Sequence, residues 1–196
     1  MARVVECFYD YGSPTSYLAA ARLPAIAAAR GAEVLWRPML LGGVFKATGN
    51  ASPVTVPAKG RWMQHDMRRW AARFGIPFEF NPSFPINTLT LMRGAVGVQM
   101  RRPQDFERYH RAVFDFMWRT PRNLGDLAVL GSSLAEAGFE PEAFHALVSD
   151  PEVKARLVAV TEEAVERGVF GAPTCFVNGQ MFFGQDRLDF VDEALA

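Results

Sequence analysis

The sequence lacks the closely spaced pair of cysteines that a dithiol redox protein needs. Its only cysteines, Cys7 and Cys175, lie near opposite ends of the chain, each within a stretch that predicts a buried strand. We interpret both as small core residues, because a structural disulfide is unusual in a cytosolic protein. The histidines His65, His110 and His145 fall on separate predicted helices without ligand-like spacing, so we expect no metal site.

The chain also lacks net charge, because 21 Lys and Arg balance 21 Asp and Glu. No strongly basic surface is implied, and we expect no nucleic-acid partner. There is no phosphate-cradling glycine loop, no secretory signal pattern and no apolar run of membrane-spanning length. We therefore expect a cytoplasmic protein without a membrane partner. Apolar residues make up 49% of the chain, as in a protein with an ordinary core.

The first forty residues predict a βαβ unit. Residues 4–9 are almost continuously apolar and predict a central strand covered on both faces. Ser13 and the proline after it are typical of a helix cap and a first helical residue, and the helix over residues 14–29 should kink at Pro24. Residues 33–37 predict a second strand, parallel to the first through a right-handed crossover.

Residues 40–167 predict no strand. Apolar residues recur there at helical spacing, and glycines and prolines mark the ends. The predicted helices cover about 62–74, 88–100, 103–117, 124–137, 141–148 and 151–167.

The last thirty residues predict a ββα unit. Asn178-Gly179 is a strong hairpin signal between strands at 174–177 and 180–183, and a closing helix follows at 187–195. The order predicts an α/β, thioredoxin-like fold (βαβ…ββα) interrupted by a large all-helical insertion. Residues 1–40 and 168–196 would form the thioredoxin-like domain, and 41–167 the insertion.

Ser13 is the candidate reactive position, because a thioredoxin-like fold places its reactive group between the first strand and helix. Two roles of this hydroxyl are compatible with each other. It can cap the helix, and it can also donate a hydrogen bond to a thiol brought beside it, where the helix dipole favours thiolate. Serine as a nucleophile in its own right is disfavoured, since no Gly-x-Ser-x-Gly elbow is present.

Other candidate residues have equally plain structural alternatives. Pro173 occupies the cis-proline position of such a fold; if cis, it turns the Ala172 backbone toward an extended peptide such as glutathione, and if trans, it merely starts a strand. Asp186 is either a helix cap or a holder of the charged γ-glutamyl end of glutathione. Asn50 and Lys59 flank a loop, and each could be an ordinary surface residue.

Together these segments resemble the 2-hydroxychromene-2-carboxylate isomerases and their relatives, the kappa-class glutathione transferases. The resemblance covers essentially the whole chain and is carried by FYDYGSPTSY, GNASPVTVPAKGRWMQHDMRRWA, GIPF, GVFGAPTCFVNG and FFGQDRL. It implies glutathione as cofactor, a small aromatic substrate, a homodimer and a catalytic Ser13. It implies glutathione contacts at Asn50, Ala172, Pro173, Gln185 and Asp186.

The implied reaction interconverts 2-hydroxychromene-2-carboxylate and trans-o-hydroxybenzylidenepyruvate in aromatic (naphthalene-type) degradation. Ring opening gives a cis enone; thiolate adds to it, the single bond rotates, and thiolate leaves. Lys59 would hold a substrate oxygen, and Trp62, Phe45 and Phe84 would form an aromatic wall. Two alternatives stay open: a kappa-class-like transferase acting on other electrophiles, and a peptide-binding module without chemistry. A dithiol oxidoreductase is disfavoured because SPTS contains no cysteine.

Overall fold

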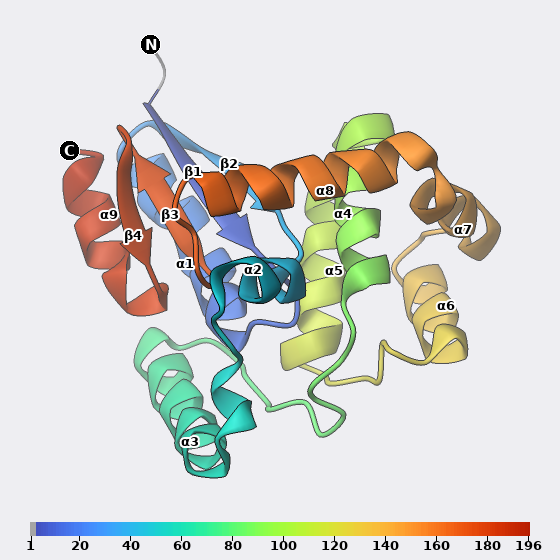
Figure 1. Cartoon of the computed structure of the whole chain (residues 1–196), viewed down its shortest axis with the longest axis horizontal. Coiled ribbons are helices and arrows are strands. Elements are labelled where there is room, and N and C mark those ends of the chain that lie inside the picture. Colours follow the sequence, from blue (N-terminus) through green and yellow to red (C-terminus); the bar gives the residue numbers. More distant parts are fainter. Residues whose placement is uncertain (1–2) are drawn as a thin grey trace.

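The computed structural model describes residues 3–196; residues 1–2 of the predicted first domain lie outside the described part. Nine α-helices and four strands are assigned among the described residues (Figure 1). The strands are β1 (Arg3–Tyr9), β2 (Ala32–Pro38), β3 (Thr174–Val177) and β4 (Gln180–Phe183). The helices are α1 (Pro14–Ala29), α2 (Leu41–Thr48), α3 (Pro57–Phe74), α4 (Leu89–Arg101), α5 (Phe106–Trp118), α6 (Leu127–Glu136), α7 (Pro141–Ser149), α8 (Pro151–Glu166) and α9 (Leu188–Ala194).

The strands form one mixed sheet in the order β2-β1-β3-β4. β1 pairs in parallel with β2 and antiparallel with β3, and β4 returns beside β3 through the Asn178-Gly179 turn. Both turn residues have positive φ, 50° and 80°, as a two-residue hairpin of this kind requires. The predicted βαβ and ββα halves are confirmed, and helices α3–α8 form the large insertion between them.

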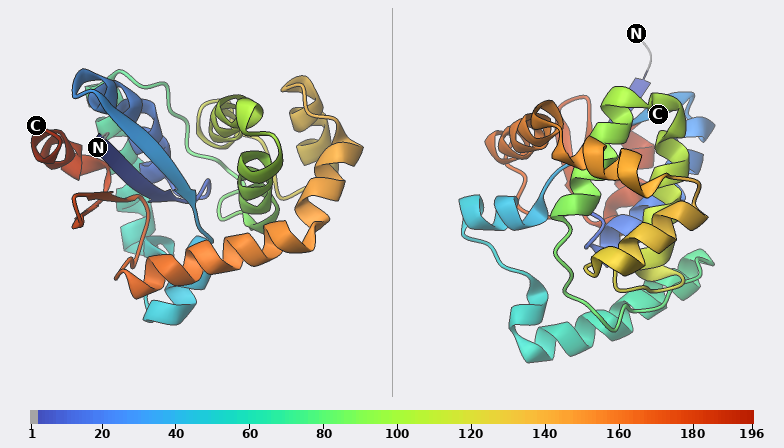
Figure 2. Two further views of the ribbon diagram at one scale, coloured as in Figure 1. Left: turned by 90° about the horizontal axis from the view of Figure 1, so that it is seen from above. Right: turned by 90° about the vertical axis from the view of Figure 1, so that its right-hand side faces the viewer.

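Alternating side chains of β1 pack into different parts of the core. Val5, Cys7 and Tyr9 belong to the main cluster, which also contains residues of α1, α9 and the helical insertion. Phe8 faces the other way into a smaller cluster with side chains of α2 and α8. The main core therefore runs without interruption from the sheet into the helices, and α8 reaches from α7 back across to the sheet (Figures 1 and 2).

Cys7 and Cys175 are directly opposed partners in the β1–β3 pairing, and both are buried free thiols. Hydrogen bonding to Cys175, together with burial, raises the pKa of the Cys7 thiol well above its ordinary value. Neither residue lines the cavity described below. The prediction that both are core residues is confirmed.

Helix α2 and its neighbouring 3₁₀ turn (Pro53–Thr55) were not predicted from the sequence, and α3 begins at Pro57, earlier than the predicted start near residue 62. α2 has only eight residues, two of them glycines, and buries only Val44 fully. A helix this short has little periodicity of its own and forms through tertiary packing. α1 continues through Pro24 without ending there.

Candidate active site

Ser13 is the N-cap of α1, as predicted. Its backbone is extended, with φ −97° and ψ 113°, and its Oγ accepts a hydrogen bond from the Ser16 N–H at 3.1 Å. Pro14 follows as the first helical residue, where its missing N–H costs no hydrogen bond. The buried hydroxyl therefore lies at the positive end of the helix dipole.

The backbone of Ala172 faces this hydroxyl. The carbonyl oxygen of Ala172 lies 3.0 Å from Ser13 Oγ and 2.9 Å from Thr15 Oγ1, and the two hydroxyl oxygens are 2.7 Å apart. The Ala172–Pro173 peptide bond is cis, as expected. Within residues 3–196 the Ala172 N–H makes no hydrogen bond, so it is available to a ligand.

Asp10 fixes the loop that carries Ser13. Its carboxylate accepts the N–H groups of Gly12 and Leu41, each at 2.8 Å, and its carbonyl oxygen accepts the Ser13 N–H at 3.0 Å. Burial raises the pKa of the Asp10 carboxyl, and these N–H donors oppose that rise. The side chain thereby ties the end of β1 to the first turn of α2.

Ser13 and Ala172 open onto a cavity of about 720 Å³, a size that suits a drug-sized ligand. Its walls come from the Ser13 loop, α2, the segment before α3, the first turns of α3, the loop before α4 and the β4 end. Six of the candidate residues line it: Ser13, Phe45, Asn50, Lys59, Phe84 and Ala172.

Four other candidates do not line this cavity. Pro173 is not among its lining residues, although it adjoins Ala172. Gln185 is buried, and the carboxylate of Asp186 pairs with Arg187 at 2.7 Å without capping a helix. Trp62, which the resemblance assigned to the aromatic wall, is 61% exposed on α3 and is not among the lining residues.

Asn50 does line the cavity, but its side chain already has partners. Its Nδ2 donates to the Phe170 carbonyl at 2.8 Å and its Oδ1 accepts the Ala51 N–H at 2.8 Å. It joins the end of α2 to the segment before the cis-proline.

Sequence reasoning missed several residues at this site. Asp10 and Thr15 are part of the segment FYDYGSPTSY, and the sequence signal that could have identified them is a polar residue on either side of Ser13. The Phe84–Pro85 bond is also cis, and Pro85 and Thr88 line the cavity. The predicted aromatic wall included Phe84 but not the adjacent Pro85.

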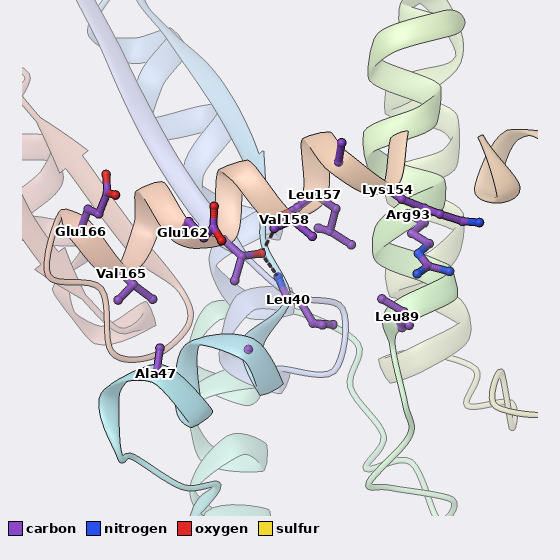
Figure 3. A pocket seen from close by; sticks show the side chains of 13 residues that line it. Leu40, Ala47, Leu89, Arg93, Lys154, Leu157, Val158, Glu162, Val165 and Glu166 are labelled. Atoms are coloured by element: carbon purple, nitrogen blue, oxygen red, sulfur yellow. Dashed lines mark hydrogen bonds between the residues drawn. The ribbon is translucent and has the colours of Figure 1, made fainter. Parts of the chain in front are cut away.

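A second cavity of about 730 Å³ lies between α2, α4 and α8 (Figure 3). Its apolar lining includes Leu89 and Val158, with the cation of Arg93 toward one end and Glu166 at the far end of α8. All its lining residues are in the described part of the chain, and none is Ser, Cys or His. The Ser13 cavity is therefore the better candidate for chemistry.

Among the described residues, no group of three potential metal ligands occurs and no helix is long and apolar enough to cross a membrane.

Comparison with known proteins places the fold in a family. The family model described as "DSBA-like thioredoxin domain" matches residues 4–196. The 2-hydroxychromene-2-carboxylate isomerase of Sphingobium xenophagum is 30% identical over 197 residues, covering 100% of this chain and 99% of that protein. Glutathione S-transferase kappa 1 of Homo sapiens is 29% identical over 207 residues, covering 100% and 92%.

A solved structure of a 2-hydroxychromene-2-carboxylate isomerase superposes with a TM-score of 0.86 at 28% identity, covering 98% of this chain and 94% of that one. The agreement extends through the helical insertion as well as the sheet. This protein therefore belongs to the family of DSBA-like thioredoxin domains, with 2-hydroxychromene-2-carboxylate isomerases and kappa glutathione transferases among its relatives.

Proposed function

We propose that this protein is a glutathione-dependent isomerase that interconverts 2-hydroxychromene-2-carboxylate and trans-o-hydroxybenzylidenepyruvate in aromatic degradation. The observation that carries the proposal is the Ser13 hydroxyl, which caps α1 and faces the Ala172 backbone in a cavity without a cysteine. A thiol needed there has to come from a cofactor. The full-length similarity to named isomerases supports the choice of reaction.

The residues present fit glutathione. The free N–H of Ala172 suits a peptide carbonyl, because such a donor otherwise has no partner within residues 3–196. Lys59, in the first turn of α3, supplies a cation at the cavity wall for a carboxylate. Ser13 and the start of α1 suit a thiolate, since a hydroxyl donor and the helix dipole both favour the charged sulfur.

When bound, glutathione supplies a thiolate that can add to the enone and leave again. The chain's own contribution is to hold that charge. Ser13 Oγ is fixed by the Ser16 N–H, so its position stays constant while its proton turns toward a ligand. A hydrogen bond to a charged group contributes about 1.5–3 kcal/mol. Ser13 thus lowers the cost of forming thiolate near neutral pH.

The substrate would lie against the part of the cavity bounded by Phe45, Phe84 and Met63. These side chains offer an apolar wall for an aromatic ring. Lys59 would pair with the pyruvoyl carboxylate or with a phenol oxygen. Trp62 is not proposed for this wall, because its side chain is mostly exposed and lies outside the cavity lining.

A kappa-class-like transferase is the second candidate, favoured by 29% identity to the human kappa enzyme over the whole chain. It would use the same Ser13 and Ala172 groups but would release a conjugate rather than glutathione.

The proposal is tested by following the equilibration of 2-hydroxychromene-2-carboxylate with the purified protein by absorbance. We expect conversion to the trans isomer with glutathione and only the uncatalysed rate without it. Equal rates with and without glutathione would exclude the proposed cofactor. No conversion under either condition would exclude the proposed reaction.

A further inference from the structure

Two hydroxyl groups and one carbonyl oxygen lie together beside the helix cap, and only the two hydroxyls can donate hydrogen bonds. Ser13 Oγ, Thr15 Oγ1 and the Ala172 carbonyl oxygen are mutually within hydrogen-bond distance, at 2.7, 3.0 and 2.9 Å. The carbonyl can only accept, and each hydroxyl has one proton to donate. The Ala172 carbonyl therefore has two candidate donors, of which one is sufficient.

The two hydroxyls differ in how firmly they are held. Ser13 Oγ also accepts the Ser16 N–H, so rotation of its proton leaves the oxygen in place. Thr15 is half-buried, lines the same cavity and is close enough to serve the carbonyl alone. If Thr15 donates to Ala172, the carbonyl stays paired while the Ser13 proton turns into the cavity.

Without the Thr15 hydroxyl, Ser13 would be the remaining side-chain donor to this carbonyl within residues 3–196. Ala172 is only 8% exposed, and a buried carbonyl left without a partner is costly. The Ser13 hydroxyl would then keep its hydrogen bond to the carbonyl, and a sulfur atom in the cavity would have to compete with the carbonyl for that donor.

We propose that Thr15 is a positioning residue. By donating a hydrogen bond to the Ala172 carbonyl, it leaves the Ser13 hydroxyl free to donate its own hydrogen bond to the sulfur of bound glutathione. This inference rests on the proposed function, and it gives the third residue of the SPTS motif a task. Thr15 touches neither reacting carbon nor sulfur in this scheme and acts through Ser13.

The test is a titration of the thiol in the glutathione complex, monitored by the ultraviolet absorbance of thiolate. Thr15→Val keeps the branched shape and removes the hydroxyl, whereas Thr15→Ser keeps the hydroxyl. We expect Thr15→Val to raise the pKa of the bound thiol by about one unit, a tenfold loss of thiolate below that pKa. Thr15→Ser should keep the wild-type value, and glutathione affinity at high pH should change little in either variant.

The outcomes separate this inference from the proposed function. A wild-type complex whose thiol titrates like free glutathione would contradict the proposed role of Ser13. A lowered thiol pKa in the wild type that persists in Thr15→Val would overturn only the role of Thr15. A raised pKa in Thr15→Ser would overturn it as well. Should Thr15→Val fail to fold, Thr15→Ala removes the same hydroxyl and carries the same expectations.

Discussion

At the scale of single residues, the proposed chemistry depends on one proton. Ser13 was identified from the sequence because SPTS follows a buried strand and begins a helix, and both features are local. The partners of its hydroxyl were harder to predict. Ala172 is far away in the sequence, and its contact with Ser13 depends on β3 pairing beside β1. Asp10 was missed because its two N–H partners include Leu41, in a helix that the sequence did not predict.

Replacing Ser13 by alanine should reduce glutathione-dependent turnover roughly ten- to hundred-fold, because one hydrogen bond to thiolate, worth about 1.5–3 kcal/mol, is lost. The helix also loses its cap, so the free energy of unfolding should fall by about 0.5–2 kcal/mol. Turnover and urea unfolding measured on the same preparation separate the two effects. Ser132→Ala, on α6, is the matched control and should leave turnover unchanged. Full activity in Ser13→Ala would remove Ser13 from the mechanism.

His110 should make the fold sensitive to acid. Burial lowers its pKa from 6.5 to about 3, and its Nε2 is a buried atom without a partner. Between these pH values the unfolded chain binds a proton that the folded chain excludes. Above pH 6.5 this residue therefore does not lower the free energy of unfolding. As the pH drops below 6.5, the free energy of unfolding falls by up to about 1.4 kcal/mol per pH unit.

The measurement is the unfolding free energy as a function of pH for the wild type and His110→Phe. Phenylalanine can keep the stacking with Phe106, whose ring centroid lies 5.2 Å from that of His110. We expect a shallower decline in the variant between pH 6.5 and 3. Identical slopes would show that other groups control acid sensitivity.

At the scale of elements, predictions succeeded where a local signal was strong. The Asn178-Gly179 hairpin and the β1–α1–β2 unit were predicted because glycine, asparagine and proline mark their turns. α2 was missed because its eight residues are stabilised by packing on α8 and by Asp10 rather than by their own sequence. Missing α2 matters to the description of the site, because this helix supplies Phe45 to the cavity wall and Asn50 follows its end.

The close packing of α4 on its neighbours gives a test of the helical insertion. A Cβ atom on Gly94 would lie 2.7 Å from Tyr109 Cζ and 2.7 Å from Phe144 Cε2. Gly94→Ala should therefore destabilise the protein by about 1–3 kcal/mol through overpacking. A Cβ on Gly131, inside α6, meets no atom within 4 Å, so Gly131→Ala should instead stabilise by about 0.5–1 kcal/mol. Chemical unfolding of both variants tests the pair, and equal effects would contradict this packing.

At the scale of the whole molecule, the sequence predicted the split fold and the place of Ser13 but not the enclosure of the site. The cavity is bounded by segments from across the chain, including Phe84 before a cis-proline and Phe183 at the end of β4. Such a boundary depends on tertiary packing, which residue periodicity does not encode. Gln185 and Asp186, both in the FFGQDRL motif, were expected to contact glutathione, but neither is among the cavity-lining residues.

The central claim, reversible use of glutathione, is tested most directly by a thiol balance. The protein is mixed with 2-hydroxychromene-2-carboxylate and an amount of glutathione far below that of substrate, and free thiol is measured before and after equilibration. Reversible addition predicts complete equilibration with unchanged free thiol. Conversion that stops when glutathione is exhausted, with one thiol lost per product, would contradict the isomerase account and favour a conjugating transferase.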